Sequence, residues 1–333
     1  MINIKQNNGL TLVELMIAML LGLIVVGAVI FMFLEVKNSS RQNENIGRMQ
    51  ENARYTLNLF TQELRNAGFY GGMLKGSYVE MDNATLNPDS DAAVSDNCSS
   101  GDDWLYNIGN PIWYKTGLTQ SDINGEQGCI SSTDLYDGAD GNGTDSISIR
   151  SVSADPIAVT DDVKTNTVYL RTNGSSGCLW HSGDSVTNSP NNPAICPSAD
   201  AFDWEFQTNL YYIDNSSGTP RLCRKKLSQT TATTITSECL VDGIERFYIE
   251  FGLDNDFDAL AENYTNDPGA STEAIVSARV YLLVRGETPD FSYTNDKTYN
   301  LGGLSITAPG DNFYRKVFST TVLLRNLTNL RNF

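Results

Sequence analysis

The sequence predicts an α+β protein with one long N-terminal helix packed on a mainly antiparallel, β-rich globular head. Two observations lead to this prediction. Residues 10–67 hold a long apolar run and then a stripe of apolar residues at helical spacing, which ends before Gly68, Gly71 and Gly72. From residue 68 onward, short apolar runs alternate with Gly, Pro, Asn, Asp and Ser, and no strand–helix–strand rhythm appears, so an antiparallel sheet is expected.

The apolar run, Leu15–Leu34, contains 20 residues without a charge. At about 1.5 Å per residue, such a helix is long enough to cross a bilayer. A secretory signal would be cut after its apolar stretch. Here the expected processing point, Gly9, precedes the stretch, so the helix would remain as an anchor.

The stripe continues the helix toward the head. It comprises Ile46, Met49, Ala53, Leu57, Phe60, Leu64 and Ala67. Residues three or four apart share one face of a helix, so this face is expected to pack on the head. A coiled-coil seam is the alternative, and the flanking Asn and Gln residues argue against it.

The head is expected to begin at residue 68 and to consist of strands and loops. Strands are predicted at 145–152, 167–171, 244–251, 274–284 and 313–324, with a hairpin formed by 210–213 and 219–227. Segments 82–103, 181–200 and 254–273 are rich in acidic residues, Asn or Pro and are predicted to be loops.

Composition argues against two functional classes. The net charge of −17 disfavours direct nucleic-acid binding, because phosphate backbones would be repelled. The basic run 224–226 is expected to be a solvated strand end. The chain has one histidine, His181, and no glycine-rich phosphate loop after a strand, so the common acid–base, zinc and nucleotide mechanisms are disfavoured.

Six cysteines lie beyond the apolar run, and no pair shows the spacing of a zinc or thioredoxin-type site. Three disulfides in an oxidising compartment are expected, and reduced buried thiols are the alternative. Six cysteines allow 15 pairings, and neighbour pairing is the simplest. It joins Cys98 to Cys129, Cys178 to Cys196, and Cys223 to Cys239.

Two acidic segments suggest calcium, which prefers oxygen ligands at such spacing. One contains Asp137, Asp140, Asn142 and Asp145, and the other spans 254–258. Neither has the closing glutamate of an EF-hand. Acidic turns are therefore favoured over calcium sites, and no cofactor is expected.

Glu14 lies one position before the apolar run, where a carboxylate is costly unless it is paired. Cleavage after Gly9 would free an amine on Leu10, and that amine on one subunit could meet Glu14 of a neighbouring subunit. The alternative is that Glu14 lies at the headgroup level of a plain anchor.

Residues 9–18, Gly-Leu-Thr-Leu-Val-Glu-Leu-Met-Ile-Ala, resemble the class III signal of type IV prepilins and pseudopilins. The resemblance implies that a prepilin peptidase cuts between Gly9 and Leu10 and methylates the new amine. It also implies that Glu14 becomes the fifth mature residue and guides subunit docking. Leu10 stands where the family usually has Phe, and the proline that kinks many pilin helices is absent.

Segments 277–285 and 314–326 resemble the closing strands of the PilW family of minor pilins, and the length of the chain also suits that family. The implied organisation is pilin-like. A leader at 1–9 is cleaved, a helix spans 10–67 with its membrane or fibre-core part at 10–34, and a disulfide-containing head spans 68–333.

By this resemblance the chain is a minor pilin that takes part in priming pilus assembly and lies at the pilus tip. The implied partners are prepilin peptidase, other minor pilins, the major pilin, the inner-membrane assembly platform and an adhesin at the tip. The head would lie in the periplasm of a Gram-negative cell before assembly and outside the cell afterwards. The alternatives are a type II secretion pseudopilin, which shares the N-terminus, and a tip adhesin or ligand-binding module.

Overall fold

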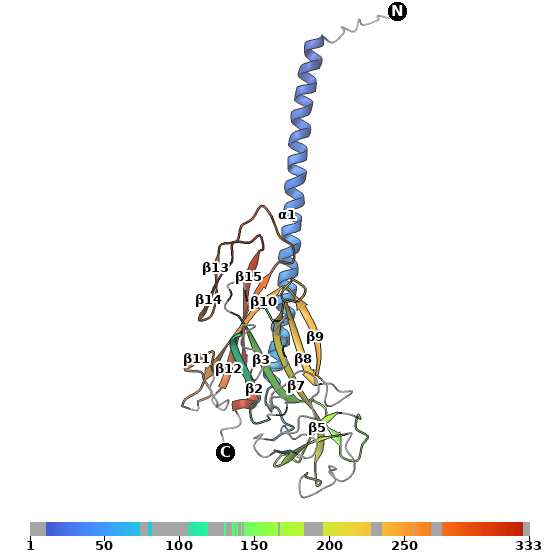
Figure 1. Cartoon of the computed structure of the whole chain (residues 1–333), viewed down its shortest axis with the longest axis vertical. Coiled ribbons are helices and arrows are strands. Elements are labelled where there is room, and N and C mark those ends of the chain that lie inside the picture. Colours follow the sequence, from blue (N-terminus) through green and yellow to red (C-terminus); the bar gives the residue numbers. More distant parts are fainter. Residues whose placement is uncertain are drawn as a thin grey trace, which may run out of the picture. The chain divides into compact units, whose positions relative to one another are not determined.

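The structure is a computed structural model, and it describes residues 11–73, 79–81, 106, 108–118, 130, 135–136, 138, 141, 143–165, 167–182, 196–227, 235–256, 258–267 and 275–328. The chain divides into two compact units, Met1–Arg48 and Met49–Phe333. Helix α1 (Leu12–Asn66) begins in the first unit and ends in the second (Figure 1).

Helix α1 is close to the predicted 10–67. It ends because Gly68 takes a φ of 73°, a conformation that glycine adopts without a steric penalty. The Ala67 amide still bonds the Glu63 carbonyl at 2.9 Å, whereas the Gly68 amide bonds the Arg150 carbonyl at 3.0 Å. Arg150 belongs to strand β3 (Thr144–Val152), so the chain passes directly from the helix onto a sheet.

The strands of the second unit form three sheets in the described part of the chain. The largest contains β1 (Val79–Met81), β2 (Ile112–Leu118), β3, β4 (Ile157–Ala158), β5 (Val168–Thr172), β6 (Gly177–His181), β7 (Phe202–Asp214), β8 (Arg221–Leu227) and β9 (Ile235–Asp242). The second has the order β11 (Asn263–Thr265), β10 (Ile244–Leu253), β12 (Ile275–Arg285), β15 (Arg315–Leu323). A hairpin of β13 (Thr298–Leu301) and β14 (Leu304–Thr307) and the short helix α2 (Arg325–Thr328) complete the unit.

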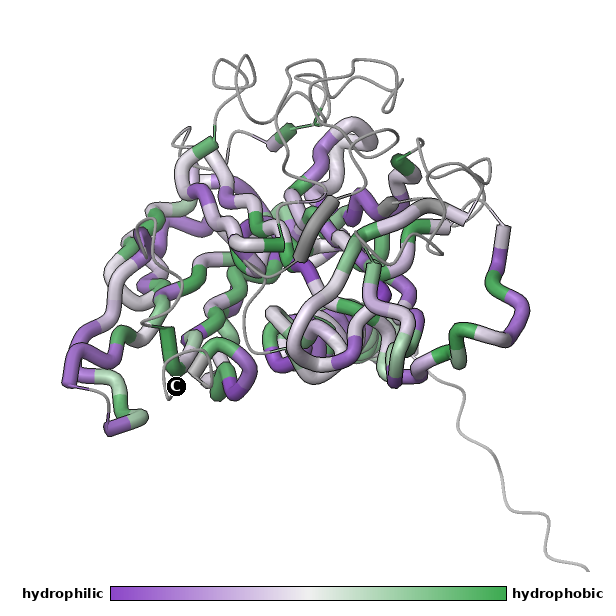
Figure 2. Tube along the Cα trace, turned by 90° about the horizontal axis from the view of Figure 1, so that it is seen from below, coloured by the Kyte–Doolittle hydropathy of each residue, from purple (hydrophilic) through white to green (hydrophobic). Residues whose placement is uncertain are grey.

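Antiparallel pairing dominates, as predicted. Among the described strands, only β1 and β6 pair in parallel. Hydrophilic and hydrophobic residues follow one another closely along the trace of the head (Figure 2). Strands β9 and β15 are half exposed, whereas β3 and β5 are buried along their whole length.

The apolar stripe of α1 packs into the main core of the second unit. Met49, Ala53, Phe60, Leu64 and Ala67 are buried there, and Leu57 packs against them. The Phe60 ring lies 5.3 Å from the ring of Tyr211 on β7 and 5.2 Å from that of Phe247 on β10. Because β7 and β10 belong to different sheets, this part of α1 joins the two sheets through one core, and the prediction of head packing is confirmed.

The predicted strands are present, and the predicted hairpin is formed by β7 and β8, with Asp214 opposite Arg221. Two predictions need correction. Segment 254–273 was expected to be a loop but contains β11, which pairs with β10. Strand β7 begins at Phe202, eight residues before the predicted start at residue 210. Segment 82–103 lies outside the described residues.

Candidate functional site

The described part of the first unit begins at Thr11, directly before α1. The Thr11 amide and hydroxyl each donate to the Glu14 carboxylate at 2.9 Å, and the Glu14 amide donates to the Thr11 hydroxyl at 3.3 Å. This reciprocal arrangement is a capping box, which satisfies backbone donors that have no partner inside the helix. The carboxylate of Glu14 is therefore held at the N-terminal end of α1. Gly9 and Leu10 lie outside the described residues.

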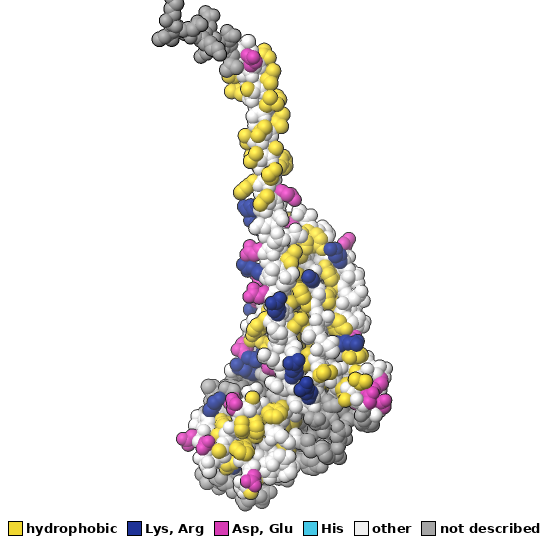
Figure 3. Space-filling model, turned by 180° about the vertical axis from the view of Figure 1, so that it is seen from behind, with side chains coloured by type: hydrophobic (Ala, Val, Ile, Leu, Met, Phe, Trp, Pro, Cys, Tyr) yellow, Lys and Arg dark blue, Asp and Glu magenta, His cyan; other side chains and the backbone are white. Residues whose placement is uncertain are grey.

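Behind this cap, α1 presents an apolar surface on all sides. Every large apolar residue from Leu12 to Val36 is 49–76% exposed. Figure 3 shows hydrophobic side chains covering this part of the helix. By length and composition the helix can cross a membrane. A helix that is apolar all round requires either lipid or other protein around it.

Two disulfides link described residues of the head. One joins Cys178 on β6 to Cys196, within a buried cluster that includes Tyr169 and Trp180. The other joins Cys223 on β8 to Cys239 on the neighbouring β9. Both are pairs that the sequence favoured. The expected Cys98–Cys129 pair lies outside the described residues.

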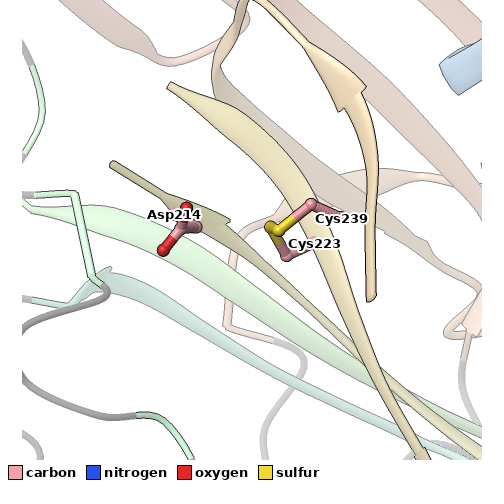
Figure 4. Close-up of side chains that lie close together, drawn as sticks. All are labelled: Asp214, Cys223 and Cys239. Atoms are coloured by element: carbon pink, nitrogen blue, oxygen red, sulfur yellow. A yellow bond between two sulfur atoms is a disulfide. The ribbon is translucent and has the colours of Figure 1, made fainter. Parts of the chain in front are cut away.

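Asp214, Cys223 and Cys239 offer ligand atoms close to one another, as a metal site would (Figure 4). The two sulfur atoms are bonded to each other, so neither is a thiolate. The Asp214 carboxylate accepts hydrogen bonds from the Arg221 guanidinium and from the Ser216 hydroxyl at 3.0 Å. These three residues therefore form a structural contact between strands.

Asp145 is fully buried and does not face a loop. Its carboxylate accepts hydrogen bonds from the Tyr114 hydroxyl at 2.5 Å, the Gly117 amide at 3.2 Å and the Arg246 guanidinium at 3.1 Å. Burial raises the pKa of this carboxyl. Because its oxygens already have protein donors, Asp145 serves in the core and not as the calcium ligand considered above. Asp137, Asp140 and Asn142 lie outside the described residues.

The second acidic segment brings carboxylates together. Oxygens of Asp254, Asp256, Asp258 and Glu262 lie within 4.8 Å of one another. Asp254 accepts the Ala259 amide at 3.0 Å, and Glu262 accepts the Asn255 amide at 2.7 Å. These bonds shape the loop between β10 and β11, as acidic side chains commonly do in turns.

Besides the ion pair between Asp145 and Arg246, a second buried ionic cluster lies in the head, and the sequence did not predict it. Arg315 donates to Glu245 at 2.6 and 3.0 Å and to Asp311 at 2.6 and 2.7 Å. Glu245 and Arg315 lie 70 positions apart, so no local pattern could pair them. The contact joins the start of β10 to the start of β15, and it is structural.

These features together define a class of protein. A capped helix begins with a carboxylate, is apolar on all sides over its first half and continues into a disulfide-containing β-rich head, and this is the architecture of type IV pilin-like subunits.

Comparison with known proteins gives two family matches, each to part of the chain. Residues 4–30 match the prokaryotic N-terminal methylation motif, and residues 210–326 match the Type IV Pilus-assembly protein W family, PilW. The N-terminus thus resembles that of methylated pilin precursors, and the C-terminal part of the head resembles the PilW family, whose members are structural and not catalytic.

A solved type IV-like pilin from Thermus thermophilus aligns with 59% of this chain and 83% of its own length, at 12% identity and a TM-score of 0.29. No relative was found among curated protein sequences.

Proposed function

We propose that this chain is a minor pilin that takes part in priming the assembly of a type IV pilus and lies at the pilus tip. The observation that carries the proposal is the apolar surface of α1 with Glu14 at its start. Such a surface needs burial in lipid before assembly and among other helices afterwards. The PilW match at 210–326 favours the pilus over the related secretion system.

In this proposal a prepilin peptidase cuts between Gly9 and Leu10, on the cytoplasmic side of the membrane, and methylates the Leu10 amine. The leader is 1–9, the helix is 10–67 and the head is 68–333. The head folds in the periplasm and forms its disulfides there. The processed subunit then joins other minor pilins, the major pilin and the inner-membrane assembly platform, and a tip adhesin can attach to it.

The role proposed for Glu14 is to pair with the Leu10 amine of an adjoining subunit. In the uncut chain the carboxylate is held by Thr11 at the N-terminal end of the helix. That is where cleavage would expose an amine. Opposite charges attract several-fold more strongly in a low-dielectric helix bundle than in water, so the pair would favour docking.

Glu14→Gln provides the sharpest test, because glutamine can also serve in a capping box and only the charge is lost. We expect the variant to insert into the membrane and to be processed, since Leu15–Leu34 and Gly9 are unchanged. It should accumulate in the inner membrane and be depleted from sheared filaments. Glu35→Gln is the matched control on the same helix and should enter filaments normally. Filament incorporation of Glu14→Gln at the wild-type level would contradict the proposed pairing.

Processing and pathway are tested separately. Mass spectrometry of the mature chain should find a methylated Leu10 as the first residue. An intact leader in cells with active prepilin peptidase would contradict the proposed processing. Deletion of the gene should remove pili and leave protein secretion intact, and the reverse outcome would assign the chain to a type II secretion system.

A further inference from the structure

The β11-β10-β12-β15 sheet has two open edges in the described part of the chain, since no described strand pairs on the outer side of β11 or of β15. Open edges present backbone donors and acceptors that another strand can use. The two edges differ in charge, and this difference indicates what each can bind.

The register shows which groups of β15 face outward. The Leu324 amide bonds the carbonyl of Val276, directly across the ladder, at 2.9 Å. Backbone groups alternate in direction along an antiparallel strand. Residues an odd number of positions from Leu324, including Thr321 and Leu323, therefore direct their amide and carbonyl groups away from β12.

A groove of about 610 Å³ opens at this end of β15. Its lining includes the outward-facing Thr321 and Leu323, the apolar Val152, and two arginines, Arg65 and Arg325. Both arginines are exposed, and neither forms an ion pair with any residue that the structure describes. None of the described residues that line the groove carries a carboxylate. In a chain with a net charge of −17 this groove is a local positive site.

The opposite edge is acidic. Asp256, Asp258 and Glu262 are exposed in the loop that leads into β11. The ladders place this loop at the same level of the sheet as the groove. Leu323 lies opposite Ser277, Ser277 opposite Gly252, and Gly252 opposite Tyr264 of β11.

We propose that these two edges bind each other in neighbouring copies of this chain, with β15 of one copy against β11 of the next. All three ladders of the sheet are antiparallel, so β15 and β11 run in opposite directions. A second copy in the same orientation therefore continues the sheet with antiparallel pairing, and its acidic loop reaches the arginine groove. Because different surfaces meet, the contact is heterologous and can repeat.

This contact goes beyond the proposed function and uses neither the apolar segment Leu15–Leu34 of α1 nor Glu14. It is tested on the full chain reconstituted in lipid nanodiscs with one copy per disc, so that the apolar helices stay apart. Sedimentation velocity should detect association of the discs at concentrations up to about 100 μM. The association should weaken when salt is raised from about 50 to about 500 mM, because exposed charges are then screened.

Arg65→Glu with Arg325→Glu should raise the dissociation constant at least tenfold, because the groove would then repel the acidic edge. Arg41→Glu with Arg54→Glu is the matched control, since it makes the same charge change at two other exposed positions of α1. The control should associate at least as well as the wild type. Equal weakening by both variants would assign the effect to net charge and overturn the proposal.

Asp256→Lys with Asp258→Lys should also abolish association. A mixture of this variant with Arg65→Glu/Arg325→Glu should associate again, because each contact then joins opposite charges. Recovery in the mixture would also show that both variants are folded. Discs of wild-type chain that stay single at all concentrations, or a mixture that fails to associate although wild type does, would overturn the proposal.

Discussion

Truncation of Phe60 to alanine tests the packing of α1 into the head most directly. Phe60 is fully buried, and its ring contacts Tyr211 on one sheet and Phe247 on another. Removing a buried phenylalanine costs about 3–5 kcal/mol, from lost burial and from the cavity left behind. Each aromatic pair adds about 0.5–1.5 kcal/mol beyond its buried area. We therefore expect a loss near the upper end of the first range, a large part of the ~5–15 kcal/mol typical of a whole domain.

The assay is urea unfolding of the full chain in detergent micelles, followed by tryptophan fluorescence. Phe60→Leu should cost less than Phe60→Ala, because leucine fills most of the cavity. Tyr55→Ala is the matched control on the same helix, since Tyr55 is 52% exposed and its truncation should change stability by no more than about 0.5 kcal/mol. If Phe60→Ala costs no more than Tyr55→Ala, this part of the helix does not belong to the cooperative core and the packing argument is refuted.

Three further predictions use the same unfolding assay. Burial raises the pKa of the Glu63 carboxyl above its ordinary value of 4.5. The folded state therefore holds the proton more tightly, and the stability of the wild type should fall as pH rises from about 4 to about 7. Glu63→Gln should lack this fall, and the same pH dependence of stability in both proteins would refute the raised pKa of Glu63. Replacing Cys223 and Cys239 by serine should lower the free energy of unfolding by about 3 kcal/mol, because the disulfide closes a loop with a sequence separation of 16. An unchanged urea midpoint of unfolding would show that the bond adds nothing to stability. Asp145→Ala removes the carboxylate that forms a buried ion pair with Arg246, so it should lower the free energy of unfolding by about 3–5 kcal/mol. A loss below about 1 kcal/mol, as for an exposed ion pair, would place Asp145 in solvent.

Local patterns predicted the elements whose own residues determine them. Helix α1 ends within a residue of its predicted end because the apolar stripe and Gly68 both act locally. Strands β10, β12 and β15 carry enough apolar residues to be recognised singly.

Other elements depend on distant partners. The start of β7 contains Asp203 and Glu205, which are typical of loops in sequence. Asp203 is buried because Arg171, its partner on β5, donates to it at 2.7 and 2.8 Å. The sequence did not predict strand β9, because that strand is polar and half exposed. Its position is determined by pairing with β8 and by the disulfide between Cys223 and Cys239.

In the candidate site, too, some contacts are determined by local sequence and others by residues that are distant in the sequence. Thr11 and Glu14 stand three residues apart before an apolar run, so the capping box could have been read from the sequence but was not. Asp145 was considered as a calcium ligand because its neighbours in sequence are acidic. Its true partner, Arg246, lies 101 positions away, and only the fold brings the two together.

The apolar surface of α1 has a consequence for how such a subunit can travel. Leaving one large apolar side chain in water costs about 1.5–3 kcal/mol relative to full burial. Even at half that figure, the 16 large apolar side chains of Leu15–Leu34 would cost on the order of 12–24 kcal/mol if the helix left lipid for water. A free-energy barrier of at least that height slows release by at least about eight orders of magnitude. The subunit can therefore exchange lipid only for protein, and each helix that leaves the bilayer must do so in contact with another apolar surface. A filament built from such subunits would return its components to the membrane when taken apart, and would not shed them into the surrounding water.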